Sequence, residues 1–406
     1  MAETYDMVIA GGSMVGATLA NALAGSGLRI AVVEASSETG VQPGAEYDLR
    51  VSAVTEASRR LFETLEVWPA MVALRVSPFR EMEVWDATGS GRIHFDGADI
   101  GVDALGYIVE NRVIQAALIE RLERLDHIDL IRPASVEQFV PGADHVEVAL
   151  DNGVVLHARL LVGADGARSR VRTEAGIPVR GWDYEQTAVV ATVKTERPHR
   201  ETAWQRFLPT GPLAFLPLGD GSCSIVWSTD PAQAQALLEL DDARFCQQLS
   251  EAFDGALGAV LSTSRRAGFP LRLQHARSYV ASRLALVGDA AHTIHPLAGQ
   301  GVNLGLLDAA ALAEVVHDAW SRGRDPGEYM VLRRYERWRK GDNLAMMSAM
   351  DGFKRLFGAR GAAVRQVRNL GLSLVDHVAP AKQSIMRRAM GTVGDLPRLA
   401  RGLKLG

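Results

Sequence analysis

Short apolar runs alternate with glycine turns and helical patterns at the beginning of the chain. The segment 5–35 opens with an apolar run at 7–10, passes through a glycine-rich turn into a helical pattern, and closes with a second apolar run at 30–33. Uninterrupted apolar runs are typical of strands that are covered on both faces. The segment therefore predicts a strand–helix–strand unit of about 30 residues.

Alternating apolar and polar positions predict antiparallel strands in later regions. Residues 79–97 and 145–166 each contain two runs around a turn, which indicates hairpins, and 187–229 contains several short strands with glycine turns. A helical pattern covers 111–125. Residues 284–316 read as a buried strand, a loop and a helix, and the chain after about 329 is expected to be wholly helical.

These patterns predict an α/β fold in which one domain is discontinuous in sequence. The whole chain is expected to contain three parts. They are a discontinuous Rossmann-like domain (1–75, 105–180 and 270–345), an inserted antiparallel β-sheet domain (76–104 and 181–269) and a C-terminal helical region (346–406). A chain of 406 residues is long enough for two or three such units with a sizeable core.

Composition narrows the classes of protein. The net charge of −4 argues against a nucleic-acid-binding protein, and the two cysteines, Cys223 and Cys246, cannot form a disulfide framework, which fits a reducing compartment. The acidic N-terminus does not read as a signal peptide, and no apolar run is long enough to span a membrane. We therefore expect a cytoplasmic protein. Residues 353–406 nevertheless carry a net charge of +9.

The turn "GGSMVG" carries the first candidate chemistry. Gly11, Ser13 and Gly16 fill the three positions of a dinucleotide-binding fingerprint, with serine in place of the second glycine. The following helix would offer free N–H groups to phosphates, and Glu34 at the end of the next strand could accept hydrogen bonds from a ribose. The alternative is a plain turn between strand and helix, but the flanking strands and the acid favour dinucleotide binding.

The stretch "GDAAHTIHPLAGQGVN" distinguishes a flavin from a nicotinamide dinucleotide. Asp289 could contact the ribityl or phosphate region, and a loop with few bulky side chains then leads into a helix whose positive end favours the charge of a reduced flavin ring. The stretch therefore predicts the flavin end of FAD. A metal site at His292 and His295 is the rival reading, but no third ligand with suitable spacing lies nearby.

A second strand followed by an acid and a glycine occurs at "LVGADGARSRVR". Asp165 and Gly166 could face the pyrophosphate region of the cofactor, with Arg168 and Arg170 nearby. Alternatively, Asp165 is a loop residue that caps the helix beginning near Ser169. The residues alone leave these two readings equal.

Taken together, the three motifs resemble those of FAD-dependent aromatic hydroxylases of the para-hydroxybenzoate hydroxylase fold. The third motif resembles the ubiquinone-biosynthesis hydroxylases in particular, and segments such as "DLRVSAVTEASRRLFETLEVW" and "FLPLGDGSCSIVWS" extend the similarity over nearly the whole chain. Within that family the chain is most similar to the 2-polyprenylphenol 6-hydroxylases. The resemblance implies a discontinuous FAD-binding domain, an inserted antiparallel β-sheet substrate domain and C-terminal helices.

The resemblance also implies a set of residues that contact FAD. They are Gly11, Ser13, Gly16, Glu34, Arg50, Arg112, Asp165, Gly288, Asp289, Pro296, Gly299, Gly301, Val302 and Asn303. Without the resemblance, Arg50 and Arg112 would be read as members of surface ion pairs.

The implied reaction is hydroxylation of the aromatic ring of a polyprenylphenol through a flavin hydroperoxide. O2 is the co-substrate, and the electrons come from NAD(P)H or a protein electron donor. The cofactor supplies the difficult chemistry, which agrees with the lack of a hydrolase triad or metal motif. No catalytic side chain can be named, although Tyr184, His292 and His295 are candidates for activating the phenol.

Other functions on this fold remain to be compared. Halogenases carry two tryptophans that are two residues apart, and no pair here has that spacing. A sister ubiquinone-pathway hydroxylase that acts at another ring position and a non-catalytic FAD-binding scaffold of the biosynthetic complex stay open as alternatives.

The resemblance suggests partners beyond the substrate. The basic segment 353–406 could dock peripherally on the inner membrane or on other ubiquinone-biosynthesis enzymes, and a merely solvated basic face is the alternative. Met346, Met350, Phe353 and Phe357 form an apolar stripe at helical spacing, suited to core packing or a lipid route. We expect a homo-oligomer and no nucleic-acid partner.

Overall fold

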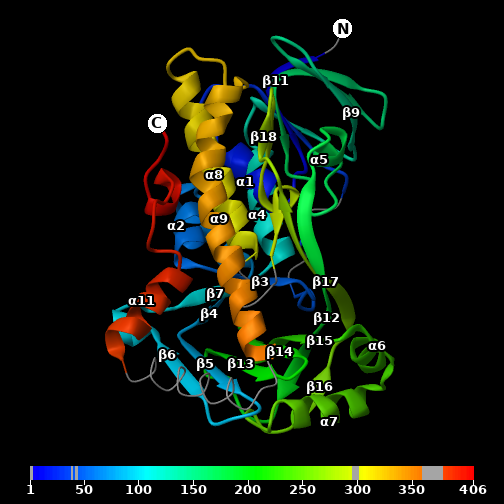
Figure 1. Ribbon diagram of the computed structural model, residues 1–406, viewed down its shortest axis with the longest axis vertical. Coiled ribbons are helices and arrows are strands. Elements are labelled where there is room, and N and C mark those ends of the chain that lie inside the picture. The colour runs from blue at the N-terminus through cyan, green and yellow to red at the C-terminus, as the bar shows by residue number, and fades with distance from the viewer. Residues whose placement is uncertain (1–2, 38–39, 42–43, 295–300, 359–377) are drawn as a thin grey trace.

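The computed structural model describes residues 3–37, 40–41, 44–294, 301–358 and 378–406, with the backbone alone at 353–358. Three β-sheets and several long helices make up these residues (Figure 1). The two larger sheets lie toward opposite ends of the molecule, and the longest helix runs past both of them. The predicted mixed α/β class is confirmed.

The first sheet contains the predicted strand–helix–strand unit. Its strands are, in spatial order, β18 (Val280–Ala281), β19 (Leu284–Leu286), β11 (Val155–Gly163), β1 (Glu3–Ala10), β2 (Ile30–Val33) and β8 (Ile128–Ile131), with β10 (Val146–Leu150) and β9 (Val136–Pro141) added beside β11. The pairings of β1 with β2, β1 with β11, β11 with β19, and β2 with β8 are parallel, whereas β10 and β11 form the predicted hairpin.

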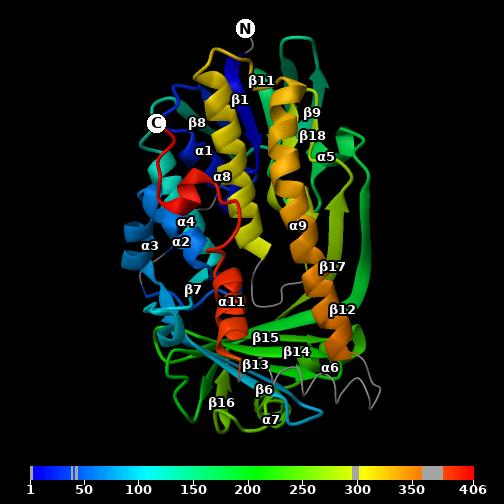
Figure 2. The same cartoon turned by 60° about the vertical axis from the view of Figure 1, so that its left-hand side comes forward.

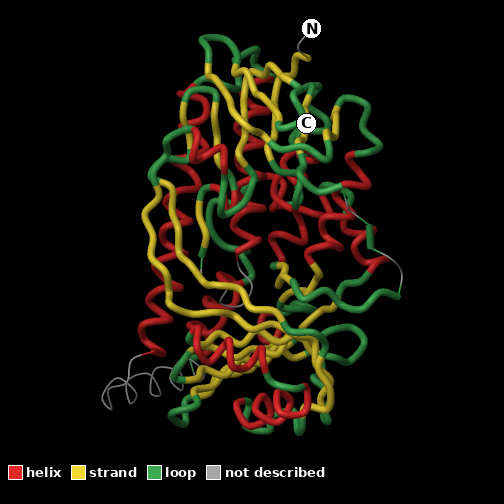
Figure 3. Tube along the Cα trace, turned by 90° about the vertical axis from the view of Figure 1, so that its right-hand side faces the viewer, coloured by secondary structure: helices red, strands yellow, loops and turns green. Residues whose placement is uncertain are grey.

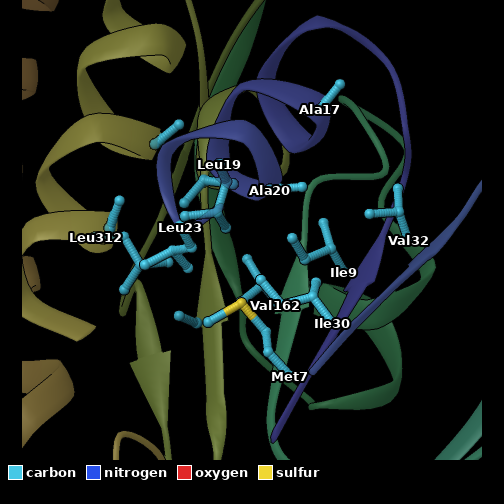
Figure 4. Packing of buried hydrophobic residues seen from close by; sticks show 14 of the residues in the cluster. Met7, Ile9, Ala17, Leu19, Ala20, Leu23, Ile30, Val32, Val162 and Leu312 are labelled. Atoms are coloured by element: carbon cyan, nitrogen blue, oxygen red, sulfur yellow. The ribbon is translucent and has the colours of Figure 1, made fainter. Parts of the chain in front are cut away.

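Helices cover the first sheet, and their apolar sides are buried against its strands in one hydrophobic cluster. Helix α1 (Met14–Ala22) packs against α4 (Asn111–Leu122) and α8 (Gly301–Trp320). Figure 4 shows Leu19 of α1 and Leu23, the residue after its end, between the strand residues Met7 and Ile9 and Leu312 of α8. This core fixes the start of α1 relative to the ends of β1 and β11.

The second sheet is largely antiparallel. Its strands are, in spatial order, β20 (His292–Thr293), β17 (Ala267–Ala276), β12 (Val179–Thr195), β15 (Cys223–Thr229), β14 (Gly211–Pro217), β13 (Thr202–Leu208), β5 (Glu81–Asp86) and β6 (Arg92–Asp96), with β16 (Val260–Thr263) beside β12. Strands β5 and β6 form the hairpin predicted at 79–97. The short helices α6 (Pro231–Glu239) and α7 (Asp242–Ala252) lie beside this sheet, and Phe245 of α7 shares its core with Phe215 of β14.

A small third sheet and two long strands connect these parts. The third sheet contains β3 (Val51–Val54), β7 (Gly106–Glu110) and β4 (Ser77–Phe79), and α2 (Glu56–Thr64) and α3 (Trp68–Leu74) complete this region, whereas the short α5 (Arg170–Glu174) packs against β9 and β11 of the first sheet. Strands β12 and β17 run as a paired ribbon from the upper part of the molecule into the second sheet (Figure 3). Through β20, this ribbon pairs with the loop that precedes α8.

Helix α9 (Tyr329–Gly358) also joins the two larger sheets. It packs on α8, contacts β18 of the first sheet and reaches β14 of the second (Figure 2). None of the helices in the described ranges is both long and apolar enough to cross a bilayer. The division into domains predicted above stays a prediction, because sheet membership alone does not define domain boundaries.

The expectation of a wholly helical chain after about 329 is wrong near the C-terminus. Helix α11 (Ala379–Ala389) is followed by turns, a 3-10 segment (Arg398–Arg401) and an irregular end. Gly391 and Gly394 have positive φ angles, and Pro397 precedes the 3-10 segment, so the local sequence stops the helix. Of the predicted apolar stripe, Met346 and Met350 are half-buried against the second sheet, while the side chains of Phe353 and Phe357 lie outside the described part.

Candidate active site

The start of α1 lies directly against the loop that follows β11. Gly11 has a φ of +102°, and a Cβ atom there would lie 2.4 Å from the carbonyl oxygen of Ala164. A Cβ atom on Gly16 would lie 1.9 Å from the carbonyl oxygen of Gly11. Both glycines are therefore required by close backbone approach, as the fingerprint predicts.

Ser13 leaves the N-terminus of α1 open. It is the N-cap residue, its side chain is exposed, and it makes no capping hydrogen bond to the helix. The first N–H groups of a helix have no partner within the helix. The end of α1 therefore offers these donors and its positive dipole to an anion.

Glu34 lies beside this glycine turn. Its Oε2 atom accepts a hydrogen bond from the backbone N–H of Gly12 at 2.7 Å, and its Oε1 atom accepts one from Ser36 at 2.9 Å. A carboxylate oxygen can accept more than one hydrogen bond, so Glu34 keeps capacity for hydroxyl donors. The structure thus brings Glu34 to the place where the ribose contact was predicted.

Asp165 caps a helix, as one of the two interpretations of its motif predicts, and its contact with the cofactor stays a prediction. Its Oδ2 atom accepts hydrogen bonds from the N–H groups of Arg170 and Val171 at 2.7 and 3.1 Å, so it caps α5 together with Ser169. Its Oδ1 atom is buried and has no hydrogen-bond partner among the residues that the structure describes. A buried carboxylate oxygen without a donor is costly, and a bound ligand could supply the donor.

Gly288 and Asp289 follow strand β19 on the other side of α1. Gly288 has a φ of +58° and lies against Val15. The Asp289 side chain retains exposed surface, yet the surrounding protein desolvates it and raises the pKa of its carboxyl, against the opposing charges of His292 and Arg50. A carboxyl that is accessible but surrounded by protein is expected at the inner edge of a ligand site.

The two predicted arginines have different surroundings. Arg50 is exposed, its charge acts on Asp289, and its guanidinium lies 5.7 Å from the ring centre of Phe269. Arg112 forms an ion pair with the buried Glu110 at 2.8 Å. Arg50 is thus placed near the candidate loop, whereas Arg112 already has a carboxylate partner.

The predicted flavin-facing loop is described only in part. Pro296, Gly299 and His295 lie outside the described residues, and α8 begins at Gly301, followed by the half-buried Val302. The buried Asn303 binds α2 and β3: its Oδ1 atom accepts from the N–H of Thr55 at 3.0 Å, and its Nδ2 atom donates to the carbonyl of Ala53 at 2.8 Å. Its side chain therefore fixes the first turn of α8.

These features fit the adenosine and phosphate half of FAD. Two glycines exclude side chains where backbone must approach, a helix N-terminus is uncapped, and Glu34 and Asp165 retain acceptor capacity. The loop at Gly288 and the start of α8 meet the same end of α1, since a Cβ atom on Gly305 would touch both Val15 and Gly288. Three motifs that are far apart in sequence thus converge, and the roles of individual residues in binding FAD remain proposals.

Sequence reasoning missed the buried polar residues behind this site. Arg172 donates to the carbonyls of Ala290 at 2.8 Å and Ala167 at 2.9 Å, and so ties two of the motif loops together. His292, named above as a candidate for activating the phenol, contacts Asp308 of α8, and both side chains are buried. The available signal was Asp308, an acid within the otherwise apolar run 304–313 of α8.

Protonation of His275 should make the fold sensitive to acid. Burial, together with the charges of Lys340 and His292, lowers the pKa of this histidine to about 4, and Glu336 opposes the shift. The unfolded chain binds this proton near pH 6.5. The contribution of His275 to the free energy of unfolding is therefore constant above that pH and falls by about 3 kcal/mol between pH 6.5 and 4. Unfolding free energies measured across this range should show a weaker slope for His275→Gln.

The exposed His145 provides the control for this measurement. His145→Gln should keep the pH dependence of the wild-type protein. An unchanged slope in His275→Gln would contradict the assignment to His275.

The fold and the converging motifs define an FAD-dependent aromatic hydroxylase. p-Nitrophenol 4-monooxygenase PnpA from Pseudomonas putida shares the fold with a TM-score of 0.78, at 20% identity over 96% of this chain and 99% of that chain. PqsL from Pseudomonas aeruginosa does so with a TM-score of 0.74, at 25% identity over 91% of this chain and 100% of that chain.

The chain belongs to the FAD binding domain family, whose model matches residues 4–340, and within it to the ubiquinone-biosynthesis hydroxylases. It is 40% identical to 3-demethoxyubiquinol 3-hydroxylase of Escherichia coli over 96% of this chain and 99% of that protein. It is 41% identical to ubiquinone hydroxylase UbiL of Rhodospirillum rubrum over 99% of this chain and 94% of that protein.

Membership of this family confirms the predicted cofactor and type of enzyme. The protein is an FAD-dependent monooxygenase of ubiquinone biosynthesis, in a class that uses O2 and either NAD(P)H or a protein electron donor. The non-catalytic scaffold is thereby set aside.

Proposed function

We propose that this enzyme hydroxylates the aromatic ring of a polyprenylphenol, at the position ortho to the phenol oxygen that the 2-polyprenylphenol 6-hydroxylases modify. The near full-length identity of about 40% to ubiquinone hydroxylases supports an aromatic ring of this pathway as the substrate, and the ring position rests on the resemblance described in the sequence analysis. The chemistry that FAD supplies when bound is the reductive activation of O2, which allows one oxygen atom to enter the ring. The protein has to bind the cofactor, orient the ring and exclude water.

We propose that residues of three loops bind the cofactor. The N-terminus of α1, from Ser13, would hold the phosphates, and Glu34 the ribose of the adenosine half. Asp165 and Asp289 would contact the part of the cofactor that extends from the phosphates toward the ring. The backbone at the start of α8 would face the ring, and its positive helix end would stabilise the negative charge of the reduced form.

An apolar cluster beside the start of α8 supports a hydrophobic substrate. Leu271 and Leu273 of β17, Tyr184 of β12, Leu304 of α8 and Met347 of α9 pack together there. Burial of a prenyl chain is worth roughly 0.8 kcal/mol per CH2 group, so the chain needs such surroundings. We propose that this cluster adjoins the ring-binding site and that its apolar side chains keep water from the reacting atoms.

Hydroxylation at another ring position is the second candidate. The relative from Escherichia coli is named a 3-demethoxyubiquinol 3-hydroxylase, which is a different position from the one proposed here. The two candidates differ in substrate, because an early prenylphenol lacks the substituents that a later intermediate carries.

Quinone precursors in cells that lack this protein distinguish the two candidates. Mass spectrometry should find an accumulated prenylphenol without added ring oxygen, and the wild-type gene should restore the normal quinone. Accumulation of a methoxylated intermediate would instead support the second candidate. An unchanged quinone profile would contradict both.

We also propose peripheral docking through the basic C-terminal segment, although fewer of its charges support this than the net charge of +9 suggested. Residues 359–377 lie outside the described part, and three of the remaining basic residues pair with acids of the body: Lys382 with Asp99, Arg398 with Glu314 and Lys404 with Glu66. These three pairs reduce the charge that the segment can offer to anionic lipids, and co-sedimentation of the full chain with anionic vesicles would test that contact.

A further inference from the structure

A buried carboxylate links the candidate flavin loop to two helices. Asp308 of α8 is fully enclosed, and its two oxygens have different partners. Its Oδ1 atom accepts from the Nε of Arg339 at 2.9 Å and from the Nδ2 of Asn343 at 3.0 Å, both on α9. These bonds hold α8 and α9 together.

The other oxygen of Asp308 faces the loop. Its Oδ2 atom lies 2.5 Å from the Nε2 of His292 and 3.3 Å from the backbone N of Gly288. Although burial alone would raise the pKa of this carboxyl, its contacts with His292, Arg339 and Asn343 hold the pKa below the usual value. The carboxylate is therefore ionised and only accepts, so His292 donates from Nε2.

The two loop residues bound by Asp308 bracket the candidate FAD contact. Gly288 and His292 lie at the ends of a five-residue segment, and Asp289 projects from it with exposed surface. A φ of +58° at Gly288 and its contact with Val15 give the segment a defined path. Arg172 holds its middle independently through a hydrogen bond to the carbonyl of Ala290.

We propose that Asp308 is a positioning residue, which acts through its Oδ2 atom on Gly288 and His292 to aim the Asp289 carboxylate at the cofactor. This inference rests on the FAD site proposed above. Asp308 does not touch the ligand itself; it fixes the segment that does. Because Arg172 anchors the segment independently, loss of the His292 bond should loosen the segment without unfolding it.

The two oxygens of Asp308 allow a matched comparison. His292→Leu removes the donor to Oδ2, whereas Asn343→Leu removes a donor to Oδ1. A purely structural role predicts that both changes act alike. The proposed role predicts that only the first weakens FAD binding beyond what its effect on stability explains.

Dissociation of FAD from the full-length holoprotein provides the readout. The regain of flavin fluorescence on dilution should give a Kd at least 10-fold higher for His292→Leu. His292→Gln, which keeps a donor, should stay within about 3-fold of the wild-type protein, and Asn343→Leu within about 2-fold, while its unfolding temperature falls. The flavin absorption band should shift in His292→Leu alone.

Two results would overturn the inference. One is a Kd for His292→Leu within 2-fold of the wild-type value, and the other is an equal rise in Kd for Asn343→Leu. His292→Asn, whose amide is too short to reach Oδ2, serves the same comparison if His292→Leu does not accumulate. Wild-type protein without any bound flavin would contradict the proposed function itself, which separates that failure from this one.

Discussion

Ser13→Asp should raise the stability of the apoprotein while it lowers FAD affinity about 100-fold. Ser13 is the N-cap residue of α1 and makes no capping bond. An aspartate caps well and favours the helix dipole, so the free energy of unfolding should rise by about 0.5–1 kcal/mol. The same carboxylate would repel the phosphates that this helix end is proposed to bind; like charges near contact cost about 4 kcal/mol at a protein surface, and screening by salt reduces this to about 3 kcal/mol, or 100-fold. FAD titration and thermal unfolding measure the two effects.

The prediction is specific because the free energy of unfolding should rise while FAD affinity falls. Ser13→Asn is the matched control, because it caps the helix with a neutral side chain of the same size and should change FAD affinity only a few-fold. If Ser13→Asp and Ser13→Asn bind FAD equally, the phosphates do not lie at the start of α1.

Arg339→Met should destabilise the fold by about 3–5 kcal/mol. Arg339 is almost fully buried, and its Nε atom donates to Asp308 at 2.9 Å while its Nη2 atom donates to Asn343 at 3.0 Å. Removal of the guanidinium leaves the Asp308 carboxylate enclosed with fewer donors, and uncompensated buried charge accounts for losses of this size. Denaturant unfolding of the two proteins measures the difference.

Arg337 on the same helix provides the control. It is exposed, so Arg337→Met should change the free energy of unfolding by no more than about 0.5 kcal/mol. The double variant Asp308→Leu with Arg339→Met removes both charges and should recover part of the loss. Equal stability of Arg339→Met and Arg337→Met would show that the buried pair contributes nothing net.

The local parts of this fold could be predicted because each has its own sequence signal. The turn at Gly11 and Gly16 is visible in the sequence because close approach of the backbone requires glycine at both positions. The hairpin at 145–166 is visible because Asn152-Gly153 lies between two alternating runs. Parallel pairing of β1 with β2 follows from the helix between them. Such signals depend on neighbours in sequence and not on the rest of the chain.

The network behind the site could not be predicted, because its members meet only in three dimensions. Arg339 and Asp308 are 31 residues apart and lie on different helices, and either would be read from sequence as an ordinary charged residue. The pairing of β20 with β17 likewise depends on tertiary contacts, since β20 has only two residues. The sequence shows Asp308 as an acid within the otherwise apolar run 304–313 of α8, but it does not show which residues pair with it.

Helix α9 has a consequence for redesign of this enzyme. Asn343, which bonds Asp308, and Met347, which belongs to the apolar cluster, are one helical turn apart on it. A larger or smaller side chain at position 347 therefore changes the packing of α9 one turn away from the bond that holds it to α8. Attempts to change substrate preference by altering this helix should therefore cost thermal stability, so screens for new specificity should include an unfolding measurement.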